Sequence, residues 1–138
     1  MAIMVRQRAI AADPFVAPAT DEQAIDLTHL FRMTLGDHGL EREVLALFDR
    51  QIGMLIDRMI AHLNAHLNAH LAAADASCVA ALAHTLKGSA RGVGAWPMAR
   101  AAEAVETAPP AELAPAVAAL AAAAGATRAA IAEILRAA

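Results

Sequence analysis

Apolar residues recur at helical spacing in several stretches of the chain, and polar, glycine or proline residues separate these stretches. Leu27, Leu30 and Phe31 lie at i, i+3 and i+4, which predicts a short helix over residues 26–31. From Leu40 a longer apolar stripe predicts a helix that runs to about residue 73, with Gly53 as a weak point. The members of this stripe are Val44, Leu47, Phe48, Leu55, Met59, Leu63 and Leu67.

Three further helices are predicted in the second half of the chain. Asp75 or Ser77 is expected to cap a helix over residues 76–92, because a short oxygen side chain accepts hydrogen bonds from a first turn. Glycines and a proline then separate this helix from one over residues 98–106. After Pro109 and Pro110 a last helix covers residues 111–136, with Pro115 tolerated only near its first turn.

Four substantial helices joined by short connections, with a shorter one ahead of them, predict an all-α fold. The expected architecture is an antiparallel four-helix bundle with a short extra N-terminal helix, over residues 21–138. Residues 1–20 show no sustained periodicity and are predicted to form a flexible N-terminal arm. Four methionines are expected to fill the core: Met33, Met54, Met59 and Met98.

Composition supports the helical prediction and narrows the function. The chain is 59% hydrophobic but only 3% aromatic, and 40 of its residues are alanine, which favours helices over strands. The net charge of -3 argues against non-specific nucleic-acid binding. The single Cys78 cannot form an internal disulfide and suits a reducing compartment. Because no long stretch is both uncharged and rich in large apolar residues, we expect a cytoplasmic protein that does not span a membrane.

The segment from His84 to Ala95 carries the chemistry. On a helical wheel, His84 points away from a predicted buried stripe, so its imidazole should be exposed. Lys87 at i+3 can reach a phosphoryl group on that ring, and Gly88 at i+4 lets a partner approach it closely. Nothing nearby in the sequence looks like a base, a metal site or an oxyanion hole. The buried stripe is formed by Val79, Leu82, Leu86, Ala90 and Val93.

The run His84-Thr85-Leu86-Lys87-Gly88-Ser89-Ala90 resembles the His-x-x-Lys-Gly-Ser/Ala-Ser/Ala motif of histidine phosphotransfer (HPt) domains. The resemblance covers about residues 24–136 and implies a four-helix bundle that relays phosphoryl groups in multistep two-component signalling. It implies that His84 is phosphorylated on Nε2, that Lys87 stabilises the phosphate and that Gly88 grants access. Ser89 would pack or hydrogen-bond within the helix.

Arg91 and Gly92 depart from the family pattern, in which many members carry a small residue followed by asparagine or another residue. Arg91 could add a second phosphate contact, select a partner, or be plain surface charge.

The resemblance also implies the partners. A receiver domain or a hybrid histidine kinase would donate the phosphoryl group, and a receiver domain would accept it. The partner receiver would supply the aspartate and Mg²⁺, so no cofactor is expected on this chain. Autokinase activity is not expected, because the sequence has no glycine-rich nucleotide loop. We expect a monomeric carrier rather than an enzyme, which docks transiently through a modest apolar patch around His84 and the short first helix.

Two other functions stay open from the sequence. The bundle could be an interaction scaffold without phosphoryl traffic. The tandem repeat that contains His62, His66 and His70 could instead make a metal buffer, since two histidines at i, i+4 can share a zinc ion. Three could not share one ion, because i to i+8 spans about 12 Å. A solvated flank that lengthens the helix accounts for the repeat more simply, and no metal site is expected.

Overall fold

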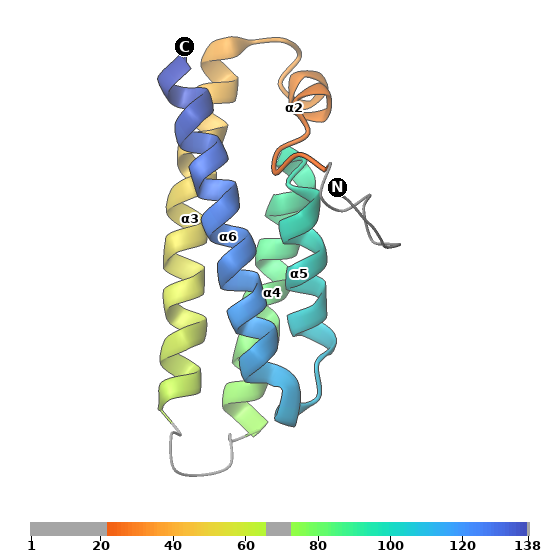
Figure 1. Cartoon of the computed structure of the whole chain (residues 1–138), viewed down its shortest axis with the longest axis vertical. Coiled ribbons are helices and arrows are strands. Elements are labelled where there is room, and N and C mark those ends of the chain that lie inside the picture. The colour runs from red at the N-terminus through yellow and green to blue at the C-terminus, as the bar shows by residue number, and fades with distance from the viewer. Residues whose placement is uncertain (1–21, 66–72, 138) are drawn as a thin grey trace, which may run out of the picture.

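Helices make up nearly all of the part of the chain that the structure describes. The computed structural model describes residues 22–65 and 73–137, and no strand occurs within these two ranges. The helices are α2 (Leu27–Met33), α3 (His38–Asn64), α4 (Ala73–Val93), α5 (Trp96–Thr107), the 3-10 turn η1 (Pro110–Glu112) and α6 (Leu113–Ala137). Figure 1 shows α3 to α6 side by side in alternating directions, with α2 at one end of the bundle. The predicted all-α antiparallel bundle with a short extra N-terminal helix is confirmed.

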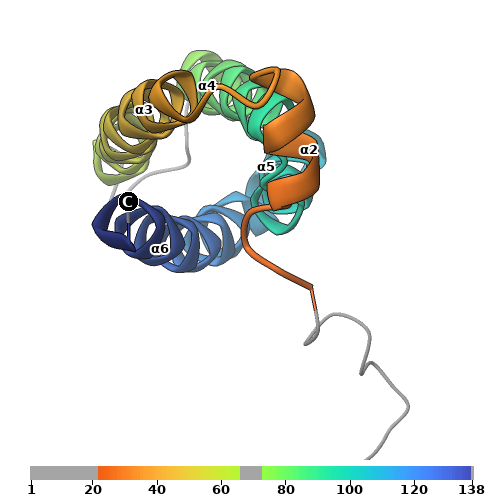
Figure 2. The same ribbon diagram turned by 90° about the horizontal axis from the view of Figure 1, so that it is seen from above.

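The four long helices enclose one core. Seen from above, they form a ring in the order α3, α4, α5, α6, and α2 covers the end where α4 turns into α5 (Figure 2). Each long helix contributes residues at three- and four-residue spacing, which places one face inward. The largest fully buried side chains are Leu30, Leu45, Ile52, Met59, Val79, Leu86, Met98, Val105, Leu120, Thr127 and Ile131. Burial of this face stabilises the bundle at about 25 cal/mol per Å² of apolar surface.

Helix boundaries agree with the predictions except around the connection between α3 and α4. The long helix ends at Asn64 rather than near residue 73, since α4 already begins at Ala73. Asp75 and Ser77 therefore lie within α4, not at its N-cap, because the alanines before them extend the helix backwards. At the start of α3, the Asp37 side chain accepts a hydrogen bond from Leu40 N, 3.0 Å away.

Two predicted core methionines and one predicted stripe residue are exposed instead. Met33, Met54 and Leu47 have 57%, 60% and 58% of their surface exposed. Leu47 and Met54 lie outside the face that α3 buries against its neighbours. That inward face consists of Leu45, Phe48, Ile52, Leu55, Ile56 and Met59. Met59 and Met98 are fully buried, as predicted.

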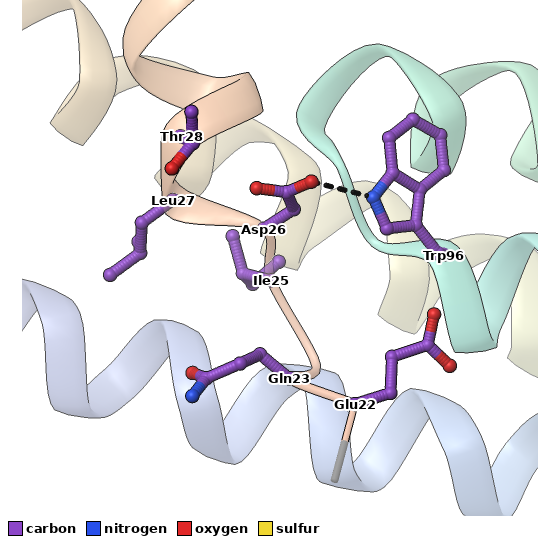
Figure 3. A pocket seen from close by; sticks show the side chains of 7 residues that line it. All are labelled: Glu22, Gln23, Ile25, Asp26, Leu27, Thr28 and Trp96. Atoms are coloured by element: carbon purple, nitrogen blue, oxygen red, sulfur yellow. Dashed lines mark hydrogen bonds between the residues drawn. The ribbon is translucent and has the colours of Figure 1, made fainter. Parts of the chain in front are cut away.

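Asp26 holds α2 against the turn between α4 and α5. Its carboxylate accepts hydrogen bonds from His29 N at 3.1 Å and from the Trp96 indole at 2.9 Å, and the latter pair face each other in Figure 3. The Asp26 backbone N–H also donates to Gly94 O at 2.8 Å. Gly94 has φ +86°, and a Cβ there would lie 3.0 Å from Asp26 O. A side chain at position 94 would therefore strain the turn and push α2 away.

The C-terminal stretch Pro110–Ala137 is long and apolar enough to cross a membrane by length and composition, and no other helix of the described chain is. Core helices of soluble proteins can also be this long and apolar. Here α6 supplies buried residues to the bundle, and 13 of its 25 residues are alanine. The helix does not establish a membrane location, and the cytoplasmic placement stays a prediction. The predicted arm, residues 1–20, lies outside the described residues.

Candidate functional site

The packing of α4 sets the direction of His84. The helix turns one face inward, and His84 lies on the opposite face with 67% of its side chain exposed, as the wheel predicts. One member of the predicted stripe differs: Leu82 is half-buried, and Ala83 takes the fully buried position beside it. The buried residues of α4 are Val79, Ala83, Leu86, Ala90 and Val93.

Glu106 of α5 joins His84 to Lys87. One carboxylate oxygen, Oε2, lies 2.7 Å from His84 Nδ1, and the other, Oε1, lies 2.7 Å from Lys87 Nζ. Oε1 is shielded from solvent, and the Lys87 side chain is only 14% exposed. The lysine ammonium is therefore the counter-charge of this oxygen, and one carboxylate bridges the imidazole and the ammonium.

The two contacts keep Glu106 ionised. Its pKa is lowered from the ordinary value of 4.5, first by the contact with Lys87 and then by the hydrogen bond with His84. An ionised carboxylate only accepts hydrogen bonds, so His84 must donate from Nδ1. In the neutral imidazole this leaves Nε2 with a free lone pair. The exposed ring thus has an anchored nitrogen and an available one.

Gly88 leaves bare backbone one turn beyond His84. It is exposed, and a Cβ built on it would meet no atom within 4 Å outside its own helix. Gly92, one turn further along α4, is bare in the same way. Ser89 is half-buried and lies on the α3 side of these glycines, in a hollow that Leu47 and Val93 also line.

Arg91 is placed at the α5 edge of α4, away from the imidazole. Its Nη2 lies 3.2 Å from Glu103 Oε1, and both side chains are about half exposed. The rise of a helix separates positions 84 and 91 by about 10 Å. The structure therefore brings together His84, Lys87 and Gly88 around one point, and it holds Arg91 in an ion pair beside them.

Glu106 is the residue that sequence reasoning missed. A charge pattern could have suggested it: Lys87 and Arg91 are spaced i, i+4 on α4, and Glu103 and Glu106 are spaced i, i+3 on α5. Residues spaced in this way lie on one face of their helix. Two basic residues on one helix can therefore pair with two acidic residues on a neighbouring helix. Which carboxylate meets which base depends on the register of α4 against α5, and the sequence does not give that register.

The histidine repeat is only partly visible. His62 Nδ1 lies 2.8 Å from Asp75 Oδ1, whereas His66 and His70 fall outside the described residues. In the part of the chain that the structure describes, no three His, Cys, Asp or Glu side chains are grouped so that they could hold a metal ion.

A comparison with protein families matches the family model described as Hpt domain to residues 43–137. The chain belongs to the Hpt domain family. The match contains α4, α5 and α6 and most of α3, so it includes His84 and Glu106. Hpt domains are phosphotransfer carrier modules that interact with receiver domains and kinases in phosphorelays, as the resemblance implied. Neither the curated proteins nor the solved structures gave a match.

Proposed function

We propose that this Hpt protein relays a phosphoryl group between receiver-domain aspartates, or from a hybrid histidine kinase to a response regulator, through phosphorylation of His84 on Nε2. The main support is the Glu106 contact, which occupies Nδ1 and leaves Nε2 on an imidazole that is 67% exposed. A carrier needs such a ring, because its phosphorylated atom must enter the active sites of two different partners.

The proposed transfer is a single displacement at phosphorus. The lone pair of Nε2 attacks the phosphorus of an aspartyl phosphate, and an N–P bond forms. The P–O bond to the aspartate breaks, and the aspartate carboxylate keeps the electron pair. Because Nδ1 retains its proton, the ring becomes more positive, and the Glu106 carboxylate 2.7 Å away stabilises that charge.

Lys87 is proposed to stabilise the phosphorylated state. A phosphoryl group brings about two negative charges to the face of α4. The Lys87 ammonium forms an ion pair with Glu106, with 2.7 Å between Nζ and Oε1, and this pair keeps the ammonium close to His84. Lys87 lies at i+3 from His84 on the same side of α4, so its ammonium can be shared between the carboxylate and the phosphoryl group.

The neighbouring residues take secondary roles in this proposal. Gly88 allows the partner's backbone to approach the ring. Ser89 supports the packing of α4 against α3. Arg91 pairs with Glu103 across the α4–α5 contact and is not assigned to the phosphate. The partner receiver supplies Mg²⁺ and its positioning groups, and the carrier itself binds no cofactor.

The test is transfer from a receiver domain that has been charged with acetyl phosphate and Mg²⁺. The full chain should gain one acid-labile, base-stable phosphoryl group, and His84→Gln should abolish the gain. A scaffold without phosphoryl traffic would remain unlabelled with every receiver in a panel. Labelling that survives His84→Gln would place the site on another residue.

A further inference from the structure

Glu106 lies close enough to His84 to determine where the imidazole carries its proton. The distance of 2.7 Å between Glu106 Oε2 and His84 Nδ1 is that of a short hydrogen bond, so a proton lies between the two atoms. A carboxylate oxygen and an unprotonated ring nitrogen are both acceptors, and without that proton they would repel each other. The contact therefore favours the ring with a proton on Nδ1 over the ring without one.

The carboxylate of Glu106 is restrained in this position. Its second oxygen, Oε1, is shielded from solvent and lies 2.7 Å from the Lys87 ammonium. Turning the carboxylate away from the ring would also break this ion pair, which includes a lysine side chain that is only 14% exposed. The contact with Lys87 and then the hydrogen bond with His84 lower the pKa of Glu106, so it is ionised at neutral pH. An anion is thus held beside the imidazole.

The neighbouring charged residues of α4 and α5 are paired with one another. The Lys87 ammonium is neutralised by Glu106, and Arg91 Nη2 lies 3.2 Å from Glu103 Oε1, about one turn along both helices. Glu103 therefore has the same charge as Glu106 and lies on the same side of α5, but it has a different partner. Within the part of the chain that the structure describes, Glu106 is the one carboxylate in contact with His84.

The α3 side of α4 presents basic residues near His84. Arg58 and His62 line a hollow of about 220 Å³ together with Thr85, the residue after His84. His62 is paired with Asp75, with 2.8 Å between Nδ1 and Oδ1. The short helix α2 contacts α4 at its C-terminal end, beside the turn into α5. Because a basic neighbour disfavours a proton on the ring, retention of that proton depends on Glu106.

We propose that Glu106 keeps the proton on Nδ1 after His84 has been phosphorylated on Nε2, and thereby extends release of the phosphoryl group to alkaline pH. The inference rests on the proposed function of His84 and adds the control of its departing step. Glu106 does not touch the phosphoryl group in this proposal. It is a positioning residue that acts through the imidazole.

The Nδ1 proton decides which leaving group forms. When the N–P bond breaks, its electron pair returns to Nε2, while phosphorus forms a bond to a carboxylate oxygen of the receiver aspartate or to water. A water that attacks gives its proton to the solvent. With a proton on Nδ1, the ring departs as neutral imidazole. Without it, the ring would depart as an imidazolate anion, which is a much poorer leaving group.

Glu106→Gln and Glu103→Gln form a matched pair of variants. Each removes one negative charge from the outer face of α5 and keeps the size of the side chain. At position 106 the amide can accept from a protonated Nδ1 through its oxygen or donate to a bare Nδ1 through its NH₂ group, so it does not favour the protonated ring. At position 103 the change affects the ion pair with Arg91 and leaves the His84 contact intact.

The experiment charges the full chain completely from a phosphorylated receiver domain, chelates Mg²⁺, removes the receiver and follows loss of the phosphoryl group to water between pH 5 and pH 10. The rate should fall as pH rises, and its midpoint should lie about one pH unit or more lower in Glu106→Gln than in wild type. Above both midpoints, the variant should therefore hold its phosphoryl group about tenfold longer. At pH 5 the two rates should agree within about twofold, and Glu103→Gln should follow wild type throughout. Transfer back to fresh receiver should show the same order.

Two outcomes would overturn the inference while the proposed function stands. One is labelling of His84 with pH profiles that coincide in wild type and Glu106→Gln. The other is an equal midpoint shift in Glu103→Gln, which would assign the effect to net charge rather than to the contact with the ring. Absence of wild-type labelling with any receiver would instead count against the proposed function itself.

Discussion

Asp26 and Glu106 each contact two hydrogen-bond donors through their carboxylates, but Asp26 has a structural role and Glu106 lies at the candidate functional site. Asp26 accepts from the Trp96 indole and from His29 N, and its contacts hold α2 on the end of the bundle. Glu106 contacts His84 Nδ1 and Lys87 Nζ on the outer face of α4. The donors to Asp26, a backbone N–H and an indole N–H, are not reactive groups. Glu106 instead contacts one nitrogen of His84 and leaves the other ring nitrogen, Nε2, available for reaction. The difference lies in the donors.

Both carboxylates have lowered pKa values, but the causes differ. For Asp26 the leading cause is the hydrogen bond from the neutral indole of Trp96. For Glu106 it is the contact with the cationic Lys87. A lowered pKa therefore identifies a carboxylate that accepts strong contacts, and it does not by itself identify a reactive site. What distinguishes Glu106 is that its partner His84 is exposed and has a second ring nitrogen, Nε2, available for reaction.

Replacement of Glu106 should have the largest effect on transfer. Glu106→Ala removes the acceptor that fixes the His84 tautomer and stabilises charge on the ring, so the transfer rate should fall about 10- to 100-fold. Tm should fall by no more than about 4 °C, because the His84 side of the contact is exposed and only Lys87 loses a carboxylate that is shielded from solvent. Timed phosphotransfer together with thermal unfolding measures both. A wild-type rate in this variant would remove Glu106 from the mechanism.

Asp26→Ala should give the opposite pattern. Loss of the N-cap of α2, and of the acceptor for Trp96, should lower Tm by about 4 °C or more. At temperatures well below the transition, transfer through His84 should stay within about twofold of wild type. Thermal unfolding followed by circular dichroism gives the first quantity. If instead transfer falls as steeply as in Glu106→Ala, α2 belongs to the reacting surface.

Gly94→Ala tests whether the contact between α2 and the α4–α5 turn stabilises the fold. The residue has φ +86°, and a Cβ would lie 3.0 Å from Asp26 O and 3.2 Å from His29 Cδ2. The variant should lose about 2 kcal/mol of unfolding free energy through backbone strain and displacement of α2. Urea denaturation measures this loss. As a control, Gly88→Ala meets no neighbour and should not destabilise the fold.

Acid should weaken the Glu106 contacts, and this is the smallest expected effect. Because the folded-state pKa is lowered from 4.5, the stabilisation is fully present above pH 4.5 and is lost as pH falls through the folded-state value. The Tm of wild type should therefore fall more steeply below pH 4.5 than that of Glu106→Gln, which has no charge to lose. Parallel Tm–pH curves would show that the contacts contribute nothing to stability.

The sequence predicted the fold and the exposed histidine because both depend on local periodicity. The stripe on α4 places His84 outward whatever the other helices do. It did not predict the role of Glu106, because Glu106 is 22 residues from His84 in the chain and their contact depends on how α4 and α5 are aligned. The sequence predicts burial for Leu47 and Met54, because an apolar residue near a helical stripe is expected to face the core, but both are exposed. Only the placement of α4 and α6 shows which face α3 turns inward.

Nitrogen NMR on the isotope-labelled full chain, after transfer from a phosphorylated receiver domain, tests the central claim most directly. The account predicts that phosphorus is bonded to Nε2 of His84 and that Nδ1 keeps its proton towards Glu106. Phosphorus on Nδ1, or on a residue other than His84, would contradict it.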